Sequence, residues 1–538
     1  MAKYLKKFML KVNEKVLKNT IERAKKQNII IPTYAQQRNP DLIPEKIKAE
    51  VKPHGLWDVH PRNLFRITWK NNVETGLYGD VNFIELPSEL TGVKARIFGL
   101  VGKYFPTGAH KVGAAFSCLV PRLVTGEFDP TTQKAVWPST GNYCRGGAYD
   151  CALLGTPSIA ILPEEMSKER FDWLKEIGSE IFATPGCESN VKEIYDKCHE
   201  LDRERGNSIV IFNQFAEFGN PIWHYHQTGS AALEVFDKIK KPGDRMSAWV
   251  SATGSAGTIA AGDHIKNVHP HAKIVASEAL QCPTLYNNGF GGHRIEGIGD
   301  KHVPWIHNAR NTDVVVAIDD ENCMRMLRVF NTPEGHEVLA QAGVKKEIID
   351  KLNLLGISSI SNVLSAIKTA KMFEMDEHDC LFTCLTDSSV MYQSRLQELE
   401  QAHGKYSHDR AMADFERYWL GEDYQDMEEL TYLARKRIHN LKYYTWCEQQ
   451  GKTVEEIREL WDPEFWDDLF SDEVVNSWDE HIKEFNERTG LFTSTERVEI
   501  REKRKGNCLV ILLMRKFVLL RYSLFLISKE ASRNDEML

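Results

Sequence analysis

A lysine beside a glycine-containing turn is the first feature of the sequence that could do covalent chemistry. Lys111 lies in the run Pro106-Thr-Gly-Ala-His-Lys-Val-Gly113, which follows the apolar segment Arg96-Ile-Phe-Gly-Leu100. At the junction of a turn and a helix, a lysine can be held in a dry site where its amine stays neutral enough to form a Schiff base. A surface lysine near a helix start has the same sequence pattern, so this motif gains meaning only beside others.

A second motif offers hydrogen-bond donors to an anion. Ser139-Thr-Gly-Asn-Tyr-Cys-Arg-Gly-Gly147 follows the apolar run Ala135-Val-Trp137. Small hydroxyl residues, glycine and asparagine at a turn between a strand and a helix present backbone N–H groups and side-chain donors, which suit a carboxylate. Asn142 could also donate to a phenolic oxygen. An ordinary N-capping turn favours the same residue types.

A third motif has the pattern of a phosphate cradle. Ser251-Ala-Thr-Gly-Ser-Ala-Gly-Thr-Ile-Ala-Ala-Gly262 directly follows Ala248-Trp-Val250. A strand, a glycine-rich loop and a helix in succession bring N–H groups together at the positive end of the helix dipole. The motif is neither a P-loop nor a clean GxGxxG, so a phosphate monoester fits better than a nucleotide. A tight turn without a ligand is the alternative.

Two further motifs could contact a planar ring. Glu296-Gly-Ile-Gly-Asp-Lys-His-Val-Pro304 contains a Gly-Ile-Gly backbone that a flat group can approach closely. Thr386-Asp-Ser-Ser389 follows the strand-like run Leu381 to Leu385. A hydroxyl group at the end of such a strand could meet a ring nitrogen at the bottom of a pocket.

The elements that must position these motifs alternate between apolar runs and helix-like stretches. The strand-like runs are Ser158-Ile-Ala-Ile-Leu162, Ser208-Ile-Val-Ile-Phe212, Ala248-Trp-Val-Ser251, Lys273-Ile-Val-Ala276, Val314-Val-Val-Ala-Ile318 and Cys380-Leu-Phe-Thr-Cys-Leu385. Between them lie the helix-like stretches Lys168 to Ile177, Val191 to Arg205 and Thr228 to Ile239. This alternation predicts buried parallel sheets in a doubly wound α/β architecture. Ligands of such sheets bind at the carboxyl ends of the strands, where the glycine-rich loops emerge.

Taken in order, the motifs resemble the fold-type II pyridoxal-phosphate enzymes, a group that includes cysteine synthase, cystathionine β-synthase and the tryptophan synthase β subunit. The resemblance covers about residues 81 to 400. It rests on Phe83-Ile-Glu-Leu-Pro87 ("TPLVxL"), Thr107-Gly-Ala-His-Lys111 ("TGAHK" of tryptophan synthase), Gln214-Phe215 with Asn220-Pro-Ile-Trp-His-Tyr-His-Gln-Thr-Gly229 (cysteine synthase), and Glu296-Gly-Ile-Gly299 ("EGIG" of cystathionine β-synthase). It implies two doubly wound α/β domains with the cofactor between them. The residues after about 400 themselves predict a helical C-terminal appendage, because no strand-like run is evident there.

The resemblance also implies residue roles. Lys111 would be the catalytic residue and would hold pyridoxal 5'-phosphate as a Schiff base. The implied cofactor-binding residues are Lys111, His110 near the phosphate, Asn142 at the phenolic oxygen, the phosphate cradle Gly254, Ser255, Ala256, Gly257 and Thr258, the flanking Gly297 and Gly299, and Ser388 at the pyridine nitrogen, with Ser389 or Thr386 as substitutes. The implied substrate-binding residues are Ser139, Thr140, Gly141, Asn142, Tyr143, Arg145 and Gln214, with Cys144 beside them. No metal site is expected.

The implied reaction is β-replacement on a serine-, O-acetylserine- or cysteine-like L-amino acid through an aminoacrylate, by a transferase or lyase. Ser139 stands where the tryptophan enzyme has a glutamate, which argues against indole chemistry. Arg145-Gly-Gly147 is similar to part of diaminopropionate ammonia-lyase, so a β-eliminating ammonia-lyase or desulfhydrase remains an alternative. Arg145 could receive an acidic substrate side chain or form a structural ion pair. A pyridoxal-phosphate-binding regulatory subunit that acts through a partner is an alternative of another class.

Composition excludes other classes of protein. The 538 residues are 42% hydrophobic and 27% charged, with 68 basic and 76 acidic residues and a net charge of −8. Bulk disorder is excluded, and there is no general electrostatic reason to bind nucleic acid or an anionic membrane. The 11 cysteines are odd in number and form no CxxC pair, which argues against a disulfide framework or a zinc knuckle. Such scattered cysteines are typical of reduced thiols in a cytoplasmic protein. The resemblance further implies a homodimer that acts on a small amino acid.

The chain divides into four expected regions. They are an N-terminal extension (1–80), a catalytic core (81–400, with a smaller subdomain at about 125–225), a helical region (401–492) and an atypical tail (493–538). Residues 1–27 hold nine lysines and arginines and no secretory signal, and we expect a helix packed on the domain behind it. No strand is evident from Lys405 to Phe492. The tail is expected to be foreign to the working fold, and the cations within Leu509 to Ile527 argue against a membrane span.

Overall fold

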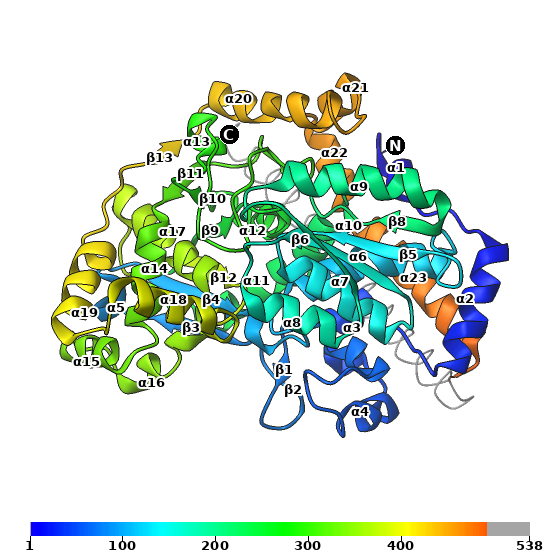
Figure 1. Cartoon of the computed structure of the whole chain (residues 1–538), viewed down its shortest axis with the longest axis horizontal. Coiled ribbons are helices and arrows are strands. Elements are labelled where there is room, and N and C mark those ends of the chain that lie inside the picture. Colours follow the sequence, from blue (N-terminus) through cyan, green and yellow to red (C-terminus); the bar gives the residue numbers. More distant parts are fainter. Residues whose placement is uncertain (1, 492–538) are drawn as a thin grey trace, which may run out of the picture.

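Two sheets built largely of parallel strands form the centre of the protein (Figure 1), seen in a computed structural model that describes residues 2–491. The larger sheet has the order β13 (Met427–Glu429), β11 (Val314–Ile318), β10 (Lys273–Ala279), β9 (Arg245–Ala252), β12 (Asp379–Leu385), β4 (Arg96–Val101) and β3 (Phe83–Leu86). Its five central strands are parallel, and β13 and β3 are antiparallel edge strands. The central strands are buried on both faces, which explains their continuous apolar sequences.

The smaller sheet is parallel throughout. Its order is β7 (Glu180–Thr184), β6 (Ser158–Pro163), β5 (Lys134–Pro138) and β8 (Ile209–Ile211). The connecting helices are α7 (Asn142–Leu153), α8 (Lys168–Glu176) and α9 (Val191–Arg205). The expected doubly wound α/β fold is confirmed. The strand β7 was not predicted because, as an edge strand, it keeps most of its side chains half-buried and lacks a continuous apolar run.

Helices join the two sheets and cover them. α6 (Lys111–Thr125) packs against α7, so the helix that begins at Lys111 contacts the smaller sheet's first helix. α12 (Ala260–Val268) packs on β9 and β10, and α17 (Ile357–Met372) is buried against β12 and β9. α6 follows β4 and α12 follows β9, so the loops that lead into these two helices leave the carboxyl ends of parallel strands in the same sheet.

The region after residue 400 is mostly helical, as expected, but it also contributes a strand. Its helices are α19 (His408–Phe415), α20 (Tyr432–Lys442), α21 (Val454–Glu459), α22 (Pro463–Leu469) and α23 (Asp472–Thr489). The expectation of no strand between Lys405 and Phe492 was wrong, because β13 pairs with β11 at the edge of the larger sheet. The three residues Met-Glu-Glu have no strand-like pattern, and a partner distant in sequence makes them extended.

The N-terminal extension packs against the C-terminal helices. The expected first helix is two helices, α1 (Leu5–Phe8) and α2 (Glu14–Lys26), and Figure 1 shows α2 beside α23. The Phe465 ring lies 5.4 Å from the ring of Tyr4 and 5.2 Å from that of Phe8, centroid to centroid. The Tyr34 backbone N–H donates to the Asp479 carboxylate at 2.6 Å. Both flanks therefore fold onto the core together.

The predictions for residues 493–538, including the stretch Leu509 to Ile527, lie outside the described residues. Within residues 2–491, no helix is long and apolar enough to cross a lipid bilayer.

Candidate active site

The motifs singled out from the sequence meet at a pocket between the two sheets, at the carboxyl ends of their strands. Lys111 begins α6, the loop after β5 leads to Asn142 at the start of α7, and the loop after β9 leads into α12. The pocket is lined by His110, Lys111, Ser139, Thr140, Asn142, Tyr143, Gln214, Ser251, Ala252, Gly254, Thr258, Gly297, Ile298, Asn362, Cys384 and Thr386. This is the position at which parallel α/β sheets bind ligands.

Lys111 has the environment that Schiff-base chemistry requires. Its Nζ lies 3.2 Å from Ser255 Oγ in the glycine-rich loop after β9. Burial lowers the pKa of the Lys111 amine from 10.5 to about 8, although Asp300 nearby opposes this shift. A useful fraction of the amine is therefore neutral near neutral pH, and a neutral amine is the nucleophile that attacks an aldehyde.

The loop from Gly254 to Thr258 fits a phosphate group. A Cβ atom at Gly257 would come 2.0 Å from Asn220 Oδ1, and one at Gly254 would come 2.8 Å from the Gly297 carbonyl oxygen. Only glycine fits at these two positions, and glycine leaves the backbone N–H groups open to an anion. The Asn220 side chain donates to Ser255 Oγ at 3.0 Å and fixes the loop. The residues present therefore fit the phosphate of pyridoxal phosphate.

Two buried histidines lie behind Lys111. The ring of His110 stacks on Trp69 with centroids 5.6 Å apart and meets the ring of His224 at 5.1 Å. Burial, followed by the charge of Lys111, holds the pKa of His110 well below its ordinary value. His224 belongs to the π-helical turn His224–Gly229, and burial lowers its pKa in the same way. Both imidazoles are neutral near neutral pH, so neither adds a charge beside the lysine.

The loop after β5 faces the pocket with the donors expected of a carboxylate site. Ser139, Thr140, Asn142 and Tyr143 line the pocket, and the Gly141 N–H donates to Ser139 Oγ at 3.0 Å. Gly141 has φ +150° and ψ −80°, a conformation open mainly to glycine. Gln214 from the segment after β8 lines the same pocket.

Several of the implied residues do not line the pocket. Ser388 and Ser389 are buried but do not line the pocket, whereas Thr386, the substitute, does. Gly299 does not line it either, and instead its N–H donates to the Thr253 carbonyl at 3.0 Å and ties two loops together. Arg145 is buried away from the pocket, with Nη2 donating to the Thr107 carbonyl at 2.9 Å. Its guanidinium also lies 4.7 Å from the Trp173 ring centroid, so these contacts of Arg145 are with protein groups.

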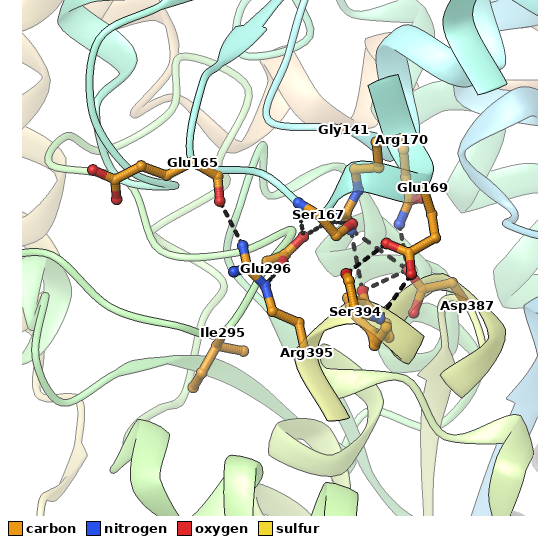
Figure 2. Close-up of polar contacts among 12 residues, drawn as sticks. Gly141, Glu165, Ser167, Glu169, Arg170, Ile295, Glu296, Asp387, Ser394 and Arg395 are labelled. Atoms are coloured by element: carbon orange, nitrogen blue, oxygen red, sulfur yellow. Dashed lines mark hydrogen bonds and ion pairs between the residues drawn. The ribbon is translucent and has the colours of Figure 1, made fainter. Parts of the chain in front are cut away.

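Gly141 of the anion-binding loop does not line the pocket, and neither do Ser255, Ala256 and Gly257 of the phosphate loop. The Cys144 thiol donates to the Gly141 carbonyl at 2.9 Å. Sequence reasoning missed the pocket-lining Asn362 and Cys384. It also missed a buried polar cluster beside the pocket, formed around Arg170, Glu296 and Asp387 (Figure 2). Asp387 and Glu296 stood inside motifs that were recognised. Arg170 carried no signal, because an arginine on an amphipathic helix is ordinarily exposed.

The strand ends of two α/β sheets meet at a pocket that contains a lysine of lowered pKa and a glycine-rich loop suited to phosphate. This combination is that of the fold-type II pyridoxal-phosphate enzymes. The family model described as "Pyridoxal-phosphate dependent enzyme" matches residues 75–360, and the chain belongs to this family. The protein is therefore an enzyme whose cofactor is pyridoxal 5'-phosphate.

Individual relatives agree with this assignment. A cysteine synthase of Staphylococcus aureus is 28% identical over 321 residues, which cover 60% of this chain and 94% of the relative. Cysteine synthase B of Campylobacter jejuni is 30% identical over 290 residues, which cover 54% of this chain and 87% of the relative. The crystal structure of a cysteine synthase from Entamoeba histolytica matches the fold with a TM-score of 0.52 and 20% identity, covering 64% of this chain and 94% of that one.

Proposed function

We propose that the enzyme replaces the β-substituent of a small L-amino acid of the serine, O-acetylserine or cysteine type. One observation carries this proposal: the Lys111 amine lies 3.2 Å from Ser255 Oγ of the phosphate loop, and Lys111 lines the same pocket as Ser139, Thr140 and Asn142 of the anion-binding loop. The cysteine synthases among the relatives support this reaction class, because their names state the synthesis of cysteine, an amino acid of this type.

The residues that would hold the cofactor follow from the pocket. Lys111 would bind it covalently, and the N–H groups of Gly254 to Thr258 would bind its phosphate. Asn142 would bond its phenolic oxygen, and Gly297 would lie along the ring. We assign Thr386, in place of Ser388, to the ring nitrogen, because Thr386 is the hydroxyl residue after β12 that lines the pocket.

The side chains of the pocket then divide the work of the reaction. When bound, pyridoxal phosphate supplies an electron sink for the electrons left on Cα of the substrate. Ser139 and Thr140 would hold the substrate carboxylate. Lys111, with a pKa of about 8, would take the proton from Cα, because a base with a pKa near the working pH is effective. Thr386 is a hydroxyl donor rather than an acid at the ring nitrogen, which favours early departure of the β-substituent.

The proposal is tested with the purified full-length protein loaded with cofactor. Its visible absorbance is recorded before and after addition of L-serine, O-acetyl-L-serine or L-cysteine, each followed by a sulfide or thiol nucleophile, and the products are identified by mass spectrometry. We expect a spectral change with one amino acid and a new amino acid bearing the nucleophile at Cβ. The Lys111→Ala variant is the control and should give neither.

Elimination is distinguished in the same experiment. A desulfhydrase or ammonia-lyase would give pyruvate and ammonia from the same amino acid, and added nucleophile would not be incorporated. That outcome would replace the proposed reaction while leaving the residue roles in place. No spectral response to any of the three amino acids would contradict the proposed substrate class.

A further inference from the structure

A buried cluster of charged and polar side chains lies directly beneath the anion-binding loop and joins the two sheets' elements (Figure 2). It comprises Arg170 of α8, Glu296 from the loop that contains Gly297, and Asp387 and Tyr392, which follow β12. All four side chains are buried, with exposed fractions of 0% for Arg170, Asp387 and Tyr392 and 3% for Glu296. Charges are rarely buried without partners, so each member needs the others.

Arg170 is the centre of this cluster. Its Nη1 forms an ion pair with Glu296 and donates to Ser167 Oγ at 3.2 Å. Its Nη2 donates to the Tyr392 hydroxyl at 3.1 Å and lies 3.8 Å from Asp387 Oδ2. Since Arg170 does not line the pocket and its terminal nitrogens are engaged by protein groups, it is not itself placed to bind substrate.

The anion-binding loop rests on Arg170. A Cβ atom at Gly141 would come 2.3 Å from Arg170 Nε, so the backbone of the loop passes directly over the guanidinium. The loop therefore has contact with the cluster before any ligand binds.

The hydrogen bonds of the cluster converge on Asp387, which accepts from both Tyr392 and Asn142. Tyr392 accepts from Arg170 and donates to Asp387 Oδ2 at 2.8 Å, and Asn142 Nδ2 donates to the same Oδ2 at 2.8 Å. At its other end, Asn142 Oδ1 accepts from Arg145 Nη1 at 3.4 Å. A carboxylate only accepts and a guanidinium only donates, so the amide of Asn142 has one permitted orientation. One Nδ2 proton is engaged by Asp387, and the other remains for a ligand in the pocket that Asn142 lines.

We propose that Asp387 is a positioning residue, which orients the Asn142 amide toward the cofactor and is itself held by Arg170 and Tyr392. This inference rests on the role proposed for Asn142 at the cofactor's phenolic oxygen. If the Asp387 side chain pointed into the pocket instead, it would place a carboxyl group near the cofactor ring. Its engagement by Asn142 and Tyr392 keeps it out of the lining and leaves that position to Thr386.

The test is a double-mutant cycle between Asp387→Asn and Asn142→Ala. Binding of pyridoxal phosphate to the apoprotein is measured by titration for the full-length protein, both single variants and the double variant. A hydrogen bond to a charged group supports an expected loss of affinity of about 10- to 100-fold for Asp387→Asn. If Asp387 acts through Asn142, the same change made in the Asn142→Ala background should weaken binding less than about threefold.

Ser394→Ala is the matched control. Ser394 Oγ donates to Glu169 at 2.7 Å and so links α8 to α18 (Gln393–His403) in the same region, but among the described residues its side chain forms no hydrogen bond with Asn142, Asp387 or Arg170. We expect it to leave cofactor affinity unchanged. If Asp387→Asn does not fold, Tyr392→Phe removes one hydrogen bond from Asp387 without removing its charge. That variant should lose a few-fold in affinity, and only when Asn142 is present.

The outcomes separate the inference from the proposed function. Equal losses from Asp387→Asn in both backgrounds would mean that Asp387 is only structural, and would overturn the inference alone. No loss of affinity in Asn142→Ala would overturn the role of Asn142 and the inference with it. Failure of Lys111→Ala to abolish the cofactor's covalent absorbance would instead overturn the proposed site.

Discussion

Burial of the Lys111 amine should destabilise the apoprotein, and the size of the effect follows from its pKa. The pKa of the Lys111 amine falls from 10.5 to about 8, so the amine binds a proton less tightly in the folded state than in the unfolded chain. Each pKa unit corresponds to about 1.4 kcal/mol, which gives a cost of about 3 kcal/mol at pH 7. This cost is an upper bound, because part of the Lys111 side chain is exposed to solvent.

The sign of the pH dependence is fixed by which state binds more protons. Between about pH 8 and 10.5 the unfolded chain keeps its proton while the folded chain has lost it, so apoprotein stability rises with pH in this range. The remaining cost at pH 9.5 is about 1.4 kcal/mol. Methionine has nearly the shape of lysine and no charge. Lys111→Met should therefore be more stable than the original apoprotein by about 3 kcal/mol at pH 7, and by less than half of that at pH 9.5.

The measurement is urea unfolding of both apoproteins, after removal of the cofactor with hydroxylamine, across this pH range. Lys94→Met, at an exposed lysine, serves as the control and should change stability little at any pH. Equal stability of Lys111→Met and the original apoprotein at pH 7 would refute the reasoning that Lys111 lies in a desolvated site. A stability difference that did not shrink with rising pH would refute the assignment of that difference to protonation of Lys111.

Two further predictions concern the phosphate loop and the C-terminal region. Gly257→Ala should weaken pyridoxal-phosphate binding by about 1–3 kcal/mol, because its Cβ would overlap Asn220 Oδ1; titration of the apoprotein measures this, and unchanged affinity would contradict the cradle. Trp446→Ala should lower the free energy of unfolding by about 3–5 kcal/mol, since the ring is buried and its Nε1 donates to the Val303 carbonyl at 2.9 Å. Urea unfolding tests it, and a change below 1 kcal/mol would mean that this region is not part of the core.

The central strands could be predicted because burial on both faces leaves a direct mark on the sequence. The runs that became β6, β9, β10, β11 and β12 are continuous and apolar, and each was expected within a few residues. β7 and β13 were not predicted, because an edge strand does not need a continuous apolar run. Its extended conformation comes from a neighbour that is distant in the chain, and local residue types do not encode that neighbour.

The site divides in the same way. The loops that carry Lys111, Asn142 and Gly254 follow predicted strands, so their convergence could be expected from topology alone. Which hydroxyl residue after β12 faces the pocket could not be predicted. Thr386 and Ser388 both carry a hydroxyl group and both lie in an irregular segment, so the sequence does not distinguish them. The cluster around Arg170 was invisible because its partners Glu296 and Asp387 come from other parts of the chain.

The flanks of the chain extend beyond residues 75–360, which the family model matches, yet they reach close to the site. The match to the Staphylococcus aureus relative covers 60% of this chain, and the two flanks pack on each other through pairs such as Tyr34 and Asp479. From the C-terminal side, Lys442 Nζ donates to the carbonyls of Trp305 and His307 at 2.8 Å each. These carbonyls belong to the segment that continues directly from the Gly297 loop of the pocket. The flanks therefore support a wall of the site from behind, and their removal should disturb the pocket rather than simply shorten the protein.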